Sequence, residues 1–364
     1  MKSREALALL TENHSDVEII EYLKETPDAN ELKSIIDKLG IPAAKLIRTK
    51  EEIFKTAAEE ANLQYQSQRL DLVLNIKNSW YDLYLVDKSL EIYHEYYDLL
   101  KDFVDAAAVK YATGEGIQAA VLKAQVEHAS IQARIKELNR RRSNLQSALN
   151  RLRNQQGNIA PLTAIDSSGF AVNLQDAQAQ ALADRPEVAA IQSRKQRIGL
   201  EYELAGKDYW PDYTLQATYI SVEDKNSMAA DAGKDAWSLM VGLNIPLWQA
   251  PRNAERERTI AAQNAEEARL QDLKIQIREN INDLIFRQAS THETIVLYKN
   301  ELLPQAENSL ASALAAYRAG RIGFLELLDA ERMLLQLRLS FINEQVNYQK
   351  TVAALERAVG KRYE

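Results

Sequence analysis

The chain has 364 residues and a formal net charge of −7; 46% of its residues are hydrophobic, 27% are charged, and only 12 are Gly and 8 are Pro. This composition excludes a disordered chain, and the scarcity of Gly and Pro among strong helix formers favours long helices. Cysteine is absent, which excludes disulfides, thiolate metal sites and a cysteine nucleophile.

Residues 1–55 predict a small α/β fragment at the N-terminus. A short helix is expected over residues 4–12, a strand over 16–23, and a second helix that begins near Pro27 and ends at Gly40. The first apolar run is too short for a secretory signal peptide. No stretch approaches the about 18 continuous apolar residues that a transmembrane helix needs.

Residues 56–155 predict a helical hairpin. Apolar positions follow a helical period over residues 56–111, a break falls at 113–116, and a second helix is expected to about Gln155. That helix carries a coiled-coil seam, in which spacings of four and three alternate. The seam consists of Ile131, Ile135, Leu138, Arg142, Leu145, Leu149 and Leu152. Residues 156–183 are interpreted as a linker or equatorial segment, in which helix resumes near Leu174.

The segment 184–364 contains one predicted β-hairpin, over residues 213–248. Its strands are expected at 213–222 and 237–248, on either side of the polar loop 223–236. In the second strand, apolar residues alternate with polar ones, and Met240 is the exception. The apolar positions are Trp237, Leu239, Val241, Leu243 and Ile245, and the wetter ones are Ser238, Gly242 and Asn244. This alternation predicts a strand with one apolar and one polar face.

After the hairpin, a long helix is expected from Pro251 to Tyr317, followed by a break at 319–323 and a last helix. This last helix carries a second seam with the same spacing. Its members are Leu325, Leu328, Arg332, Leu335, Leu339, Ile342 and Val346. Arg142 and Arg332 are each expected to form an interhelical ion pair that sets the register, or else to reach out to water.

The two helix breaks are copies of one pattern. Tyr111-x-x-Gly114 is matched by Tyr317-x-x-Gly320, and both are followed at the same distance by Leu-x-Ala. A Gly with positive φ ends a helix, and a short connection makes the next helix return antiparallel. Each break is therefore predicted to be the tip of a long helical hairpin, in a chain that contains an internal repeat.

Three features together resemble the TolC-like outer-membrane efflux proteins over residues 56–364. They are the duplicated Tyr-x-x-Gly turn, the Arg185-Pro186-Glu187 motif, and the hairpin that begins at Tyr209-Trp210-Pro211 and closes on Ile245-Pro246-Leu247-Trp248. The aromatic residues around the strands favour the CzcC-like heavy-metal branch. The resemblance implies a mainly α protein with antiparallel coiled-coil hairpins, whose one β-hairpin contributes to an oligomeric outer-membrane β-barrel.

The resemblance also implies partners and site residues. A homotrimer would span the outer membrane, contact its lipid, and work with a periplasmic adaptor and an inner-membrane pump to export small molecules or metal ions. The adaptor would dock on Gly114, Gly116, Ile117, Gly320, Ile322, Gly323 and Phe324. The barrel face would include Tyr213, Leu215, Tyr219, Trp237, Leu239, Val241, Leu243, Ile245 and Trp248. Glu326, Asp329 and Glu331 are candidate pore carboxylates.

Residues 1–55 resemble a different family, the arsenate reductases of the ArsC/Spx group. The match rests on Lys2-Ser3-Arg4 and on the helix–strand–helix pattern up to Gly40. In that family the nucleophilic Cys precedes the Lys-Ser-Arg stretch, and without any Cys the thiol chemistry is excluded. Because the first efflux repeat, 56–155, is also truncated, we expect the chain to join two gene fragments through fusion, truncation or an assembly error.

No catalytic, cofactor or metal constellation is predicted. The four His residues form no i, i+4 pair. The carboxylate pairs are interpreted as solvated helix faces, and they include Glu59–Glu60, Glu266–Glu267 and Asp329/Glu331. The run Arg140–Arg142 does not indicate nucleic-acid binding in an acidic chain. The alternative to a channel is a soluble coiled-coil scaffold, or a non-functional fusion product that carries an inactive arsenate-reductase fragment.

Overall fold

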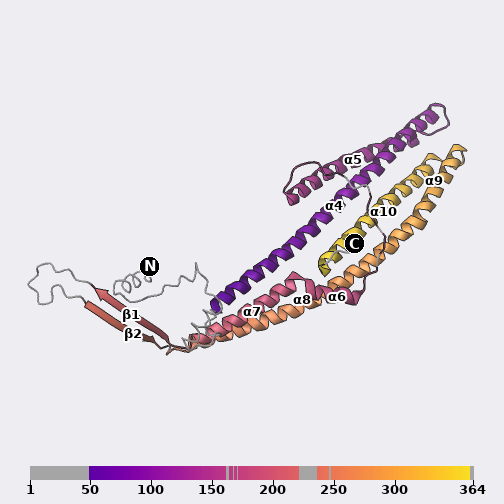
Figure 1. Ribbon diagram of the computed structural model, residues 1–364. Coiled ribbons are helices and arrows are strands. Elements are labelled where there is room, and N and C mark those ends of the chain that lie inside the picture. Colours follow the sequence, from indigo (N-terminus) through magenta and orange to yellow (C-terminus); the bar gives the residue numbers. More distant parts are fainter. Residues whose placement is uncertain are drawn as a thin grey trace, which may run out of the picture. The chain divides into compact units, whose positions relative to one another are not determined.

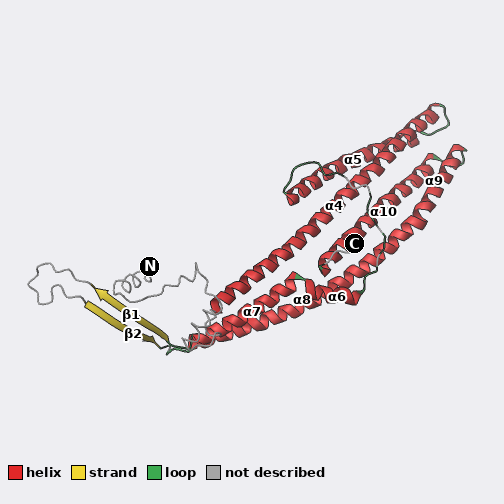
Figure 2. Ribbon diagram, in the orientation of Figure 1, coloured by secondary structure: helices red, strands yellow, loops and turns green. Residues whose placement is uncertain are grey.

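The structure, a computed structural model, describes residues 49–160, 164–166, 168, 169, 171–220, 236–245 and 247–360 (Figures 1 and 2). The predicted α/β fragment, apart from its last residues, and the predicted loop 223–236, apart from residue 236, lie outside this range. The chain divides into two compact units. The larger consists of residues 56–202 and 247–364, and the smaller includes the β-hairpin.

Helix dominates the described residues, as the composition predicts. The helices are α4 (Thr49–Ala112), α5 (Gln118–Arg153), α6 (Leu174–Asp184), α7 (Pro186–Lys207), α8 (Ala250–Leu297), α9 (Leu303–Arg318) and α10 (Phe324–Val359), with the π-helical turn η1 (Tyr298–Leu302) between α8 and α9. The strands are β1 (Asp212–Ile220) and β2 (Ala236–Asn244). The predicted helix bounds agree closely, although α4 begins earlier than expected and the π turn was not predicted. Strand β2 ends at Asn244, so the predicted extension of this strand to 248 is wrong.

The boundary between α6 and α7 follows from local chemistry. The Asn173 side chain caps α6 by accepting hydrogen bonds from the backbone N–H groups of Gln175 (2.9 Å) and Asp176 (3.2 Å). Arg185 ends α6 in an extended conformation, because the residue before a proline is disfavoured in helix. Pro186 then opens α7, where its missing N–H costs nothing.

Three hydrophobic clusters form the core of the larger unit, and the smallest consists of Leu83, Leu149 and Ile159. The first joins α4, α5 and α10 and consists of Val86, Leu90, Tyr96, Leu100, Ala120, Ala124, Ile131, Ile135, Leu138, Phe324 and Leu328. The second joins α6, α7, α8 and α10 and consists of Ala177, Ala181, Val188, Leu270, Ile277, Ile281, Leu284, Leu355, Ala358 and Val359. The predicted seams contribute to both the buried and the half-buried positions of these helices.

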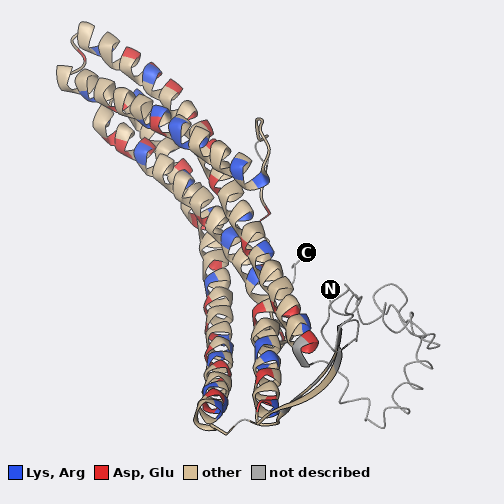
Figure 3. Ribbon diagram, turned by 90° about the vertical axis from the view of Figure 1, so that its left-hand side faces the viewer, with Lys and Arg blue, Asp and Glu red and all other residues tan. Residues whose placement is uncertain are grey.

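Charged residues are distributed along the whole length of the helices (Figure 3). Three carboxylates that we expected on solvated faces are instead buried: Glu331 on α10, Glu60 on α4 and Glu266 on α8. Arg194 of α7 pairs with the last two, at 2.6 Å from Glu60 and 3.5 Å from Glu266. The prediction was wrong at these two positions because α7 packs against both helices and supplies the compensating charge.

Candidate functional site

The turn between α4 and α5 forms the first hairpin tip. Gly114 has a φ of +77°, its N–H donates to the carbonyl of Tyr111 (3.1 Å), and the N–H of Glu115 donates to the carbonyl of Lys110 (2.9 Å). These two bonds define a Schellman motif with the glycine in the left-handed position. Helix α5 starts after Ile117, which is extended with φ −105° and ψ 141°.

The turn between α9 and α10 repeats this geometry bond for bond. Gly320 has a φ of +68°, its N–H donates to the carbonyl of Tyr317 (3.0 Å), and the N–H of Arg321 donates to the carbonyl of Ala316 (2.9 Å). Every group here is numbered 206 above its counterpart in the first tip, as 320 is above 114. Helix α10 likewise starts after an extended residue, Gly323. The predicted duplicated turn is confirmed.

The equivalence extends along both returning helices. Each of α5 and α10 contains 36 residues, and each ends at a left-handed residue, Asn154 (φ 50°) or Gly360 (φ 83°), at the same offset. We therefore call positions equivalent when their numbers differ by 206, from residues 97 and 303 onward. The π turn η1, directly before residue 303, has no counterpart in α4.

The side chains at the two tips lie in different surroundings. In the first tip Ile117 is 64% exposed, and a side chain at Gly116 would crowd the backbone of Lys110 at 3.1 Å. In the second tip Phe324 is buried, with its ring centroid 5.8 Å from Phe103 and 6.3 Å from Tyr317. Ile322 is half-buried. The predicted docking residues thus lie in both tips, but Phe324 belongs to the core of the hairpin pair.

The β-hairpin of the smaller unit is antiparallel and in a single register. Each residue on one face of β1 opposes an apolar residue of β2; the pairs are Tyr213–Leu243, Leu215–Val241, Ala217–Leu239 and Tyr219–Trp237. The register therefore unites the predicted barrel residues of both strands on one face. Val241 is 74% exposed, and Leu239, Leu243, Ile245, Leu247 and Trp248 are exposed as well.

The sequence profile of one family, described as "Outer membrane efflux protein", matches residues 178–361. The chain belongs to this family. The matched segment includes α7, the β-hairpin, the second tip and α10. The Arg-Pro-Glu motif and the second Tyr-x-x-Gly turn therefore lie inside it, whereas the first turn, at Tyr111 to Gly114, lies outside.

Individual efflux proteins are similar to this chain over most of its length. The cobalt-zinc-cadmium resistance protein CzcC of Cupriavidus metallidurans is 24% identical over 307 residues, which cover 80% of this chain and 68% of CzcC. The structure of the outer-membrane channel OprN is similar in fold, with a TM-score of 0.75 and 18% identity over 86% of this chain and 71% of OprN.

A separate match concerns 55 residues, or 15% of the chain. They are 44% identical to an arsenate reductase of Neisseria meningitidis and span 47% of its length. The resemblance of the N-terminal segment to arsenate reductases is therefore confirmed. The chain spans about half of that relative.

The three candidate pore carboxylates of this efflux protein do not share one surface. Asp329 is exposed and lies 3.8 Å from Arg332. The Glu326 carboxylate folds back over Gly323 in the first turn of α10, where the helix dipole favours a negative charge. Glu331 is only 8% exposed. Burial raises the pKa of its carboxyl, against the opposing effect of Arg338. A pore role for these three groups stays a prediction.

Both seam arginines form interhelical ion pairs, which is the first of the two alternatives that we predicted. Arg142 of α5 donates to Asp87 of α4 at 2.5 Å. Arg332 of α10 donates through its Nε to Glu127 of α5 at 3.0 Å, and a second nitrogen bonds the other carboxylate oxygen. These contacts set the register of α5 against α4 and of α10 against α5.

Sequence reasoning missed a second polar contact set, although the Arg-Pro-Glu motif signalled it. Arg357 of α10 donates to Asp71 (2.8 Å), to Ser67 (3.3 Å) and to Glu187, and so ties α10 to α4 and α7. Burial alone would raise the pKa of the Glu187 carboxyl, but hydrogen bonds from Arg185, Arg357 and Ser67 lower it to about 2. We use the name Arg357 clasp for the group formed by Arg357, Glu187, Asp71, Ser67 and Arg185.

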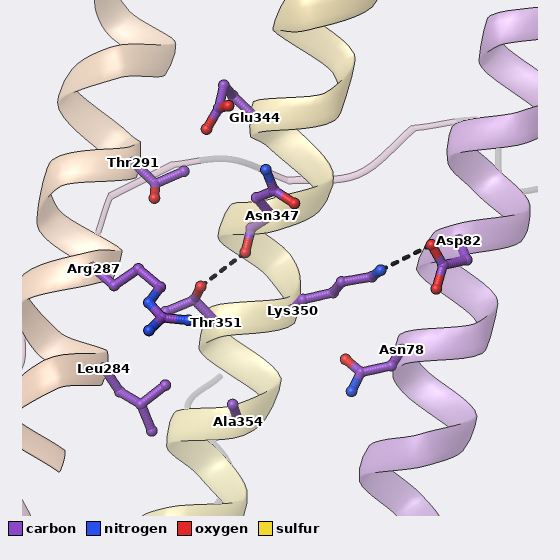
Figure 4. A pocket seen from close by; sticks show the side chains of 10 residues that line it. All are labelled: Asn78, Asp82, Leu284, Arg287, Thr291, Glu344, Asn347, Lys350, Thr351 and Ala354. Atoms are coloured by element: carbon purple, nitrogen blue, oxygen red, sulfur yellow. Dashed lines mark hydrogen bonds and ion pairs between the residues drawn. The ribbon is translucent and has the colours of Figure 1, made fainter. Parts of the chain in front are cut away.

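A polar pocket of about 680 Å³ lies between α4, α8 and α10 (Figure 4). Across it Lys350 pairs with Asp82 at 2.9 Å, and Arg287 and Glu344 also line it. Within the described part of the chain, no three His, Asp or Glu side chains gather closely enough to hold a metal ion. None of the described helices is long and apolar enough to span a bilayer.

Proposed function

We propose that this chain is a channel subunit of a tripartite efflux system in the outer membrane. Three copies form the tube, each contributes its β-hairpin to a shared barrel, and the tips of the helical hairpins dock on a periplasmic adaptor. The adaptor connects the tube to an inner-membrane pump, which selects the cargo. Two observations support this proposal: the chain belongs to the family, and it contains both the long helical hairpins and a β-hairpin.

The apolar face of the β-hairpin is the observation that carries the proposal. Four apolar pairs lie in register on one face, and the described ones among them are exposed. Such a face is costly in water, and two strands cannot close their own edges. Both problems are solved when hairpins from several copies close a barrel whose apolar face contacts lipid.

The proposed cargo follows from the similarity of this chain to CzcC. CzcC is named for resistance to cobalt, zinc and cadmium. We infer that metal ions are the cargo of this system, and that they pass through the tube without a resident binding site. The arsenate-reductase-like segment is assigned no reaction, because arsenate reduction in that family uses a Cys and the chain has none.

Two neighbouring residues of β2 allow a matched test of the barrel. Val241 and Met240 are both exposed and apolar, at 74% and 51%, but they lie on opposite faces of the strand. Arg at a lipid-facing position near the bilayer midplane costs about 2–4 kcal/mol, whereas lumen positions tolerate charge. We expect Val241→Arg to remove the protein from the outer membrane and Met240→Arg to leave it there.

The measurement is fractionation of cells that make the full chain, followed by blotting of the outer-membrane and soluble fractions. Wild-type protein in the soluble fraction would contradict the proposal and favour the soluble scaffold. Equal behaviour of the Val241→Arg and Met240→Arg variants would contradict the assignment of the two faces. Sedimentation of the extracted protein as a trimer tests the assembly independently.

A further inference from the structure

The polar pocket between α4, α8 and α10 is formed by one chain and lies within its larger unit (Figure 4). Its volume of about 680 Å³ is in the range that small-molecule sites occupy. Thr291 and Arg287 project from α8 toward α10, and Asn78 projects from α4 toward α10. Polar side chains from three helices therefore converge on one space.

The first helical hairpin carries apolar residues at equivalent positions. Glu344 and Thr351 of α10, which line the pocket, are equivalent to Leu138 and Leu145 of α5. Leu138 is buried in the cluster that joins α4, α5 and α10, and Leu145 packs against it. The same backbone is thus built with apolar side chains at these positions. The fold does not require the polar residues of the pocket, and a binding role accounts for them.

Three of the four charged side chains that line the pocket have a partner. Lys350 pairs with Asp82 at 2.9 Å, and Arg287 pairs at 2.7 Å with Asp283, which lies outside the pocket. Glu344 is half-buried and forms no ion pair within the described part of the chain. A half-buried carboxylate is stabilised by a cation that bonds to it. The pocket can therefore accept one positive charge, at Glu344.

Two neutral groups of the pocket also lack a partner among the residues that the structure describes. Thr291 is only 9% exposed, and its hydroxyl makes no hydrogen bond there. The Oδ1 atom of Asn78 is buried and accepts none. The hydroxyl of Thr351, by contrast, donates to the carbonyl of Asn347 at 2.9 Å. Since buried polar groups are normally hydrogen-bonded, Thr291 and Asn78 can receive hydroxyl or N–H groups of a bound molecule.

These groups select against most classes of ligand. A divalent metal ion needs more oxygen ligands than the single unpaired carboxylate and its neutral neighbours supply. An anion would face the unpaired Glu344. An apolar molecule would leave Thr291 and Asn78 buried without hydrogen bonds, which is costly. The class that fits is a small organic cation with several hydroxyl groups.

We propose that this pocket binds a free primary amine on a hydroxyl-rich frame, of the amino-sugar class. The ammonium group bonds to the carboxylate of Glu344, and ligand hydroxyl groups bond to Thr291 and Asn78. Lys350 and Arg287 keep their Asp partners and have further N–H groups that donate to the ligand's hydroxyl oxygens. The bound molecule contacts α4, α8 and α10 together and so stabilises the larger unit.

Calorimetric titration of the purified full-length protein with glucosamine at neutral pH tests this proposal. Three matched compounds dissect the recognition: glucose and N-acetylglucosamine lack the ammonium group, and cyclohexylamine keeps it but lacks the hydroxyl groups. We expect glucosamine to bind at least about tenfold more tightly than glucose or N-acetylglucosamine, because a hydrogen bond between charged groups is lost in both. It should also bind more tightly than cyclohexylamine.

Variants assign the binding to the pocket. Glu344→Gln keeps the shape of the side chain and removes its charge, and should weaken glucosamine binding about tenfold or more. Glu279→Gln makes the same change at an exposed carboxylate of α8 outside the pocket and should leave binding unchanged. Thr291→Val should weaken binding about two- to tenfold, and Thr291→Ser should retain it. Circular dichroism checks that each variant is folded.

Several outcomes would overturn the proposal. They are the absence of glucosamine binding at millimolar concentrations, equal binding of glucosamine and N-acetylglucosamine, and equal binding by the folded Glu344→Gln and Glu279→Gln variants. None of these results bears on the proposed channel function, because the pocket lies within one chain. Conversely, a protein that fractionates as soluble can still bind glucosamine, so the two proposals fail separately.

Discussion

Arg357 and Arg151 occupy equivalent positions near the ends of α10 and α5, yet their surroundings differ. Arg357 is held by Glu187, Asp71 and Ser67, whereas Arg151 is exposed. The same holds nearer the tips, where Leu328 is buried and Leu122 is exposed. The two helical hairpins therefore have the same backbone geometry, but their equivalent faces contact different neighbours.

This comparison shows which parts of a repeat are set locally. The Schellman turns need a glycine in the left-handed position and little else, so both copies reproduce them. Burial depends on contacts between distant segments. In this chain α10 lies between α4/α5 and α9, while α5 leaves one face open. Side chains at equivalent positions therefore contribute differently to the free energy of unfolding.

The largest expected effect compares Leu328→Ala with Leu122→Ala. Removing the fully buried Leu328 side chain should lower the free energy of unfolding by about 2–5 kcal/mol. The same change at Leu122, 54% exposed in the single chain, should cost less than about 0.5 kcal/mol in the dissociated subunit. Urea unfolding followed by circular dichroism checks this, and equal losses at both positions would contradict the unequal environments.

The Arg357 clasp gives the next largest difference. Arg357→Ala leaves the half-buried Glu187 and its neighbours without their cation, and should cost about 2–3 kcal/mol, between the values for buried and surface pairs. Arg151→Ala removes an exposed side chain and should be close to neutral. The same urea titration measures both variants. A loss at Arg151 as large as at Arg357 would show that the ends of both helices are clasped.

Much of this arrangement could be predicted from the sequence because its signals are local. Gly114 and Gly320 mark the turns, and the spacing of the seams identifies the buried stripes. Arg142 and Arg332 were expected either to form interhelical pairs or to reach out to water, and the structure contains the pairs. Alternation along β2 predicts its apolar face, which the register then extends to β1. Each of these signals lies within one element or one turn.

The misses share a different physical origin. Glu60 and Glu266 were expected in water, but Arg194 of a third helix compensates both of them in the interior. Glu331 was also expected in water, but it lies on the face of α10 that packs against α4 and α5 and is only 8% exposed. The sequence of one element does not record which helix will cover it, so these positions could not be predicted.

The pH dependence of stability tests the Arg357 clasp through the carboxylate of Glu187. The pKa of the Glu187 carboxyl is about 2, below its ordinary value of 4.5. A lowered carboxyl pKa contributes stability that is present above 4.5 and is lost as the pH falls toward 2. After a discount for partial exposure, we expect this loss to be about 1–2 kcal/mol.

Urea unfolding at several pH values between about 5 and 2 measures this loss in the wild-type protein, and the same series is measured for the Glu187→Gln variant. The variant lacks the titrating group and should show a correspondingly flatter dependence. Position 151 has no such carboxylate among its described contacts, so Arg151→Ala should retain the wild-type slope. An unchanged slope in Glu187→Gln would show that other carboxylates cause the acid sensitivity.

The smallest effects come from the tip glycines, and here the two hairpins should agree. A Cβ at Gly114 or Gly320 would meet no atom within 4 Å, so Ala at either position costs only the strain of a positive φ, about 1 kcal/mol. Gly199, within α7, also has open space around it but no positive φ, and Gly199→Ala should stabilise the helix by about 0.5–1 kcal/mol. Thermal unfolding of the three variants compares them directly. Stabilisation at Gly114 or Gly320 would contradict the left-handed turn on which the equivalence of the two hairpins rests.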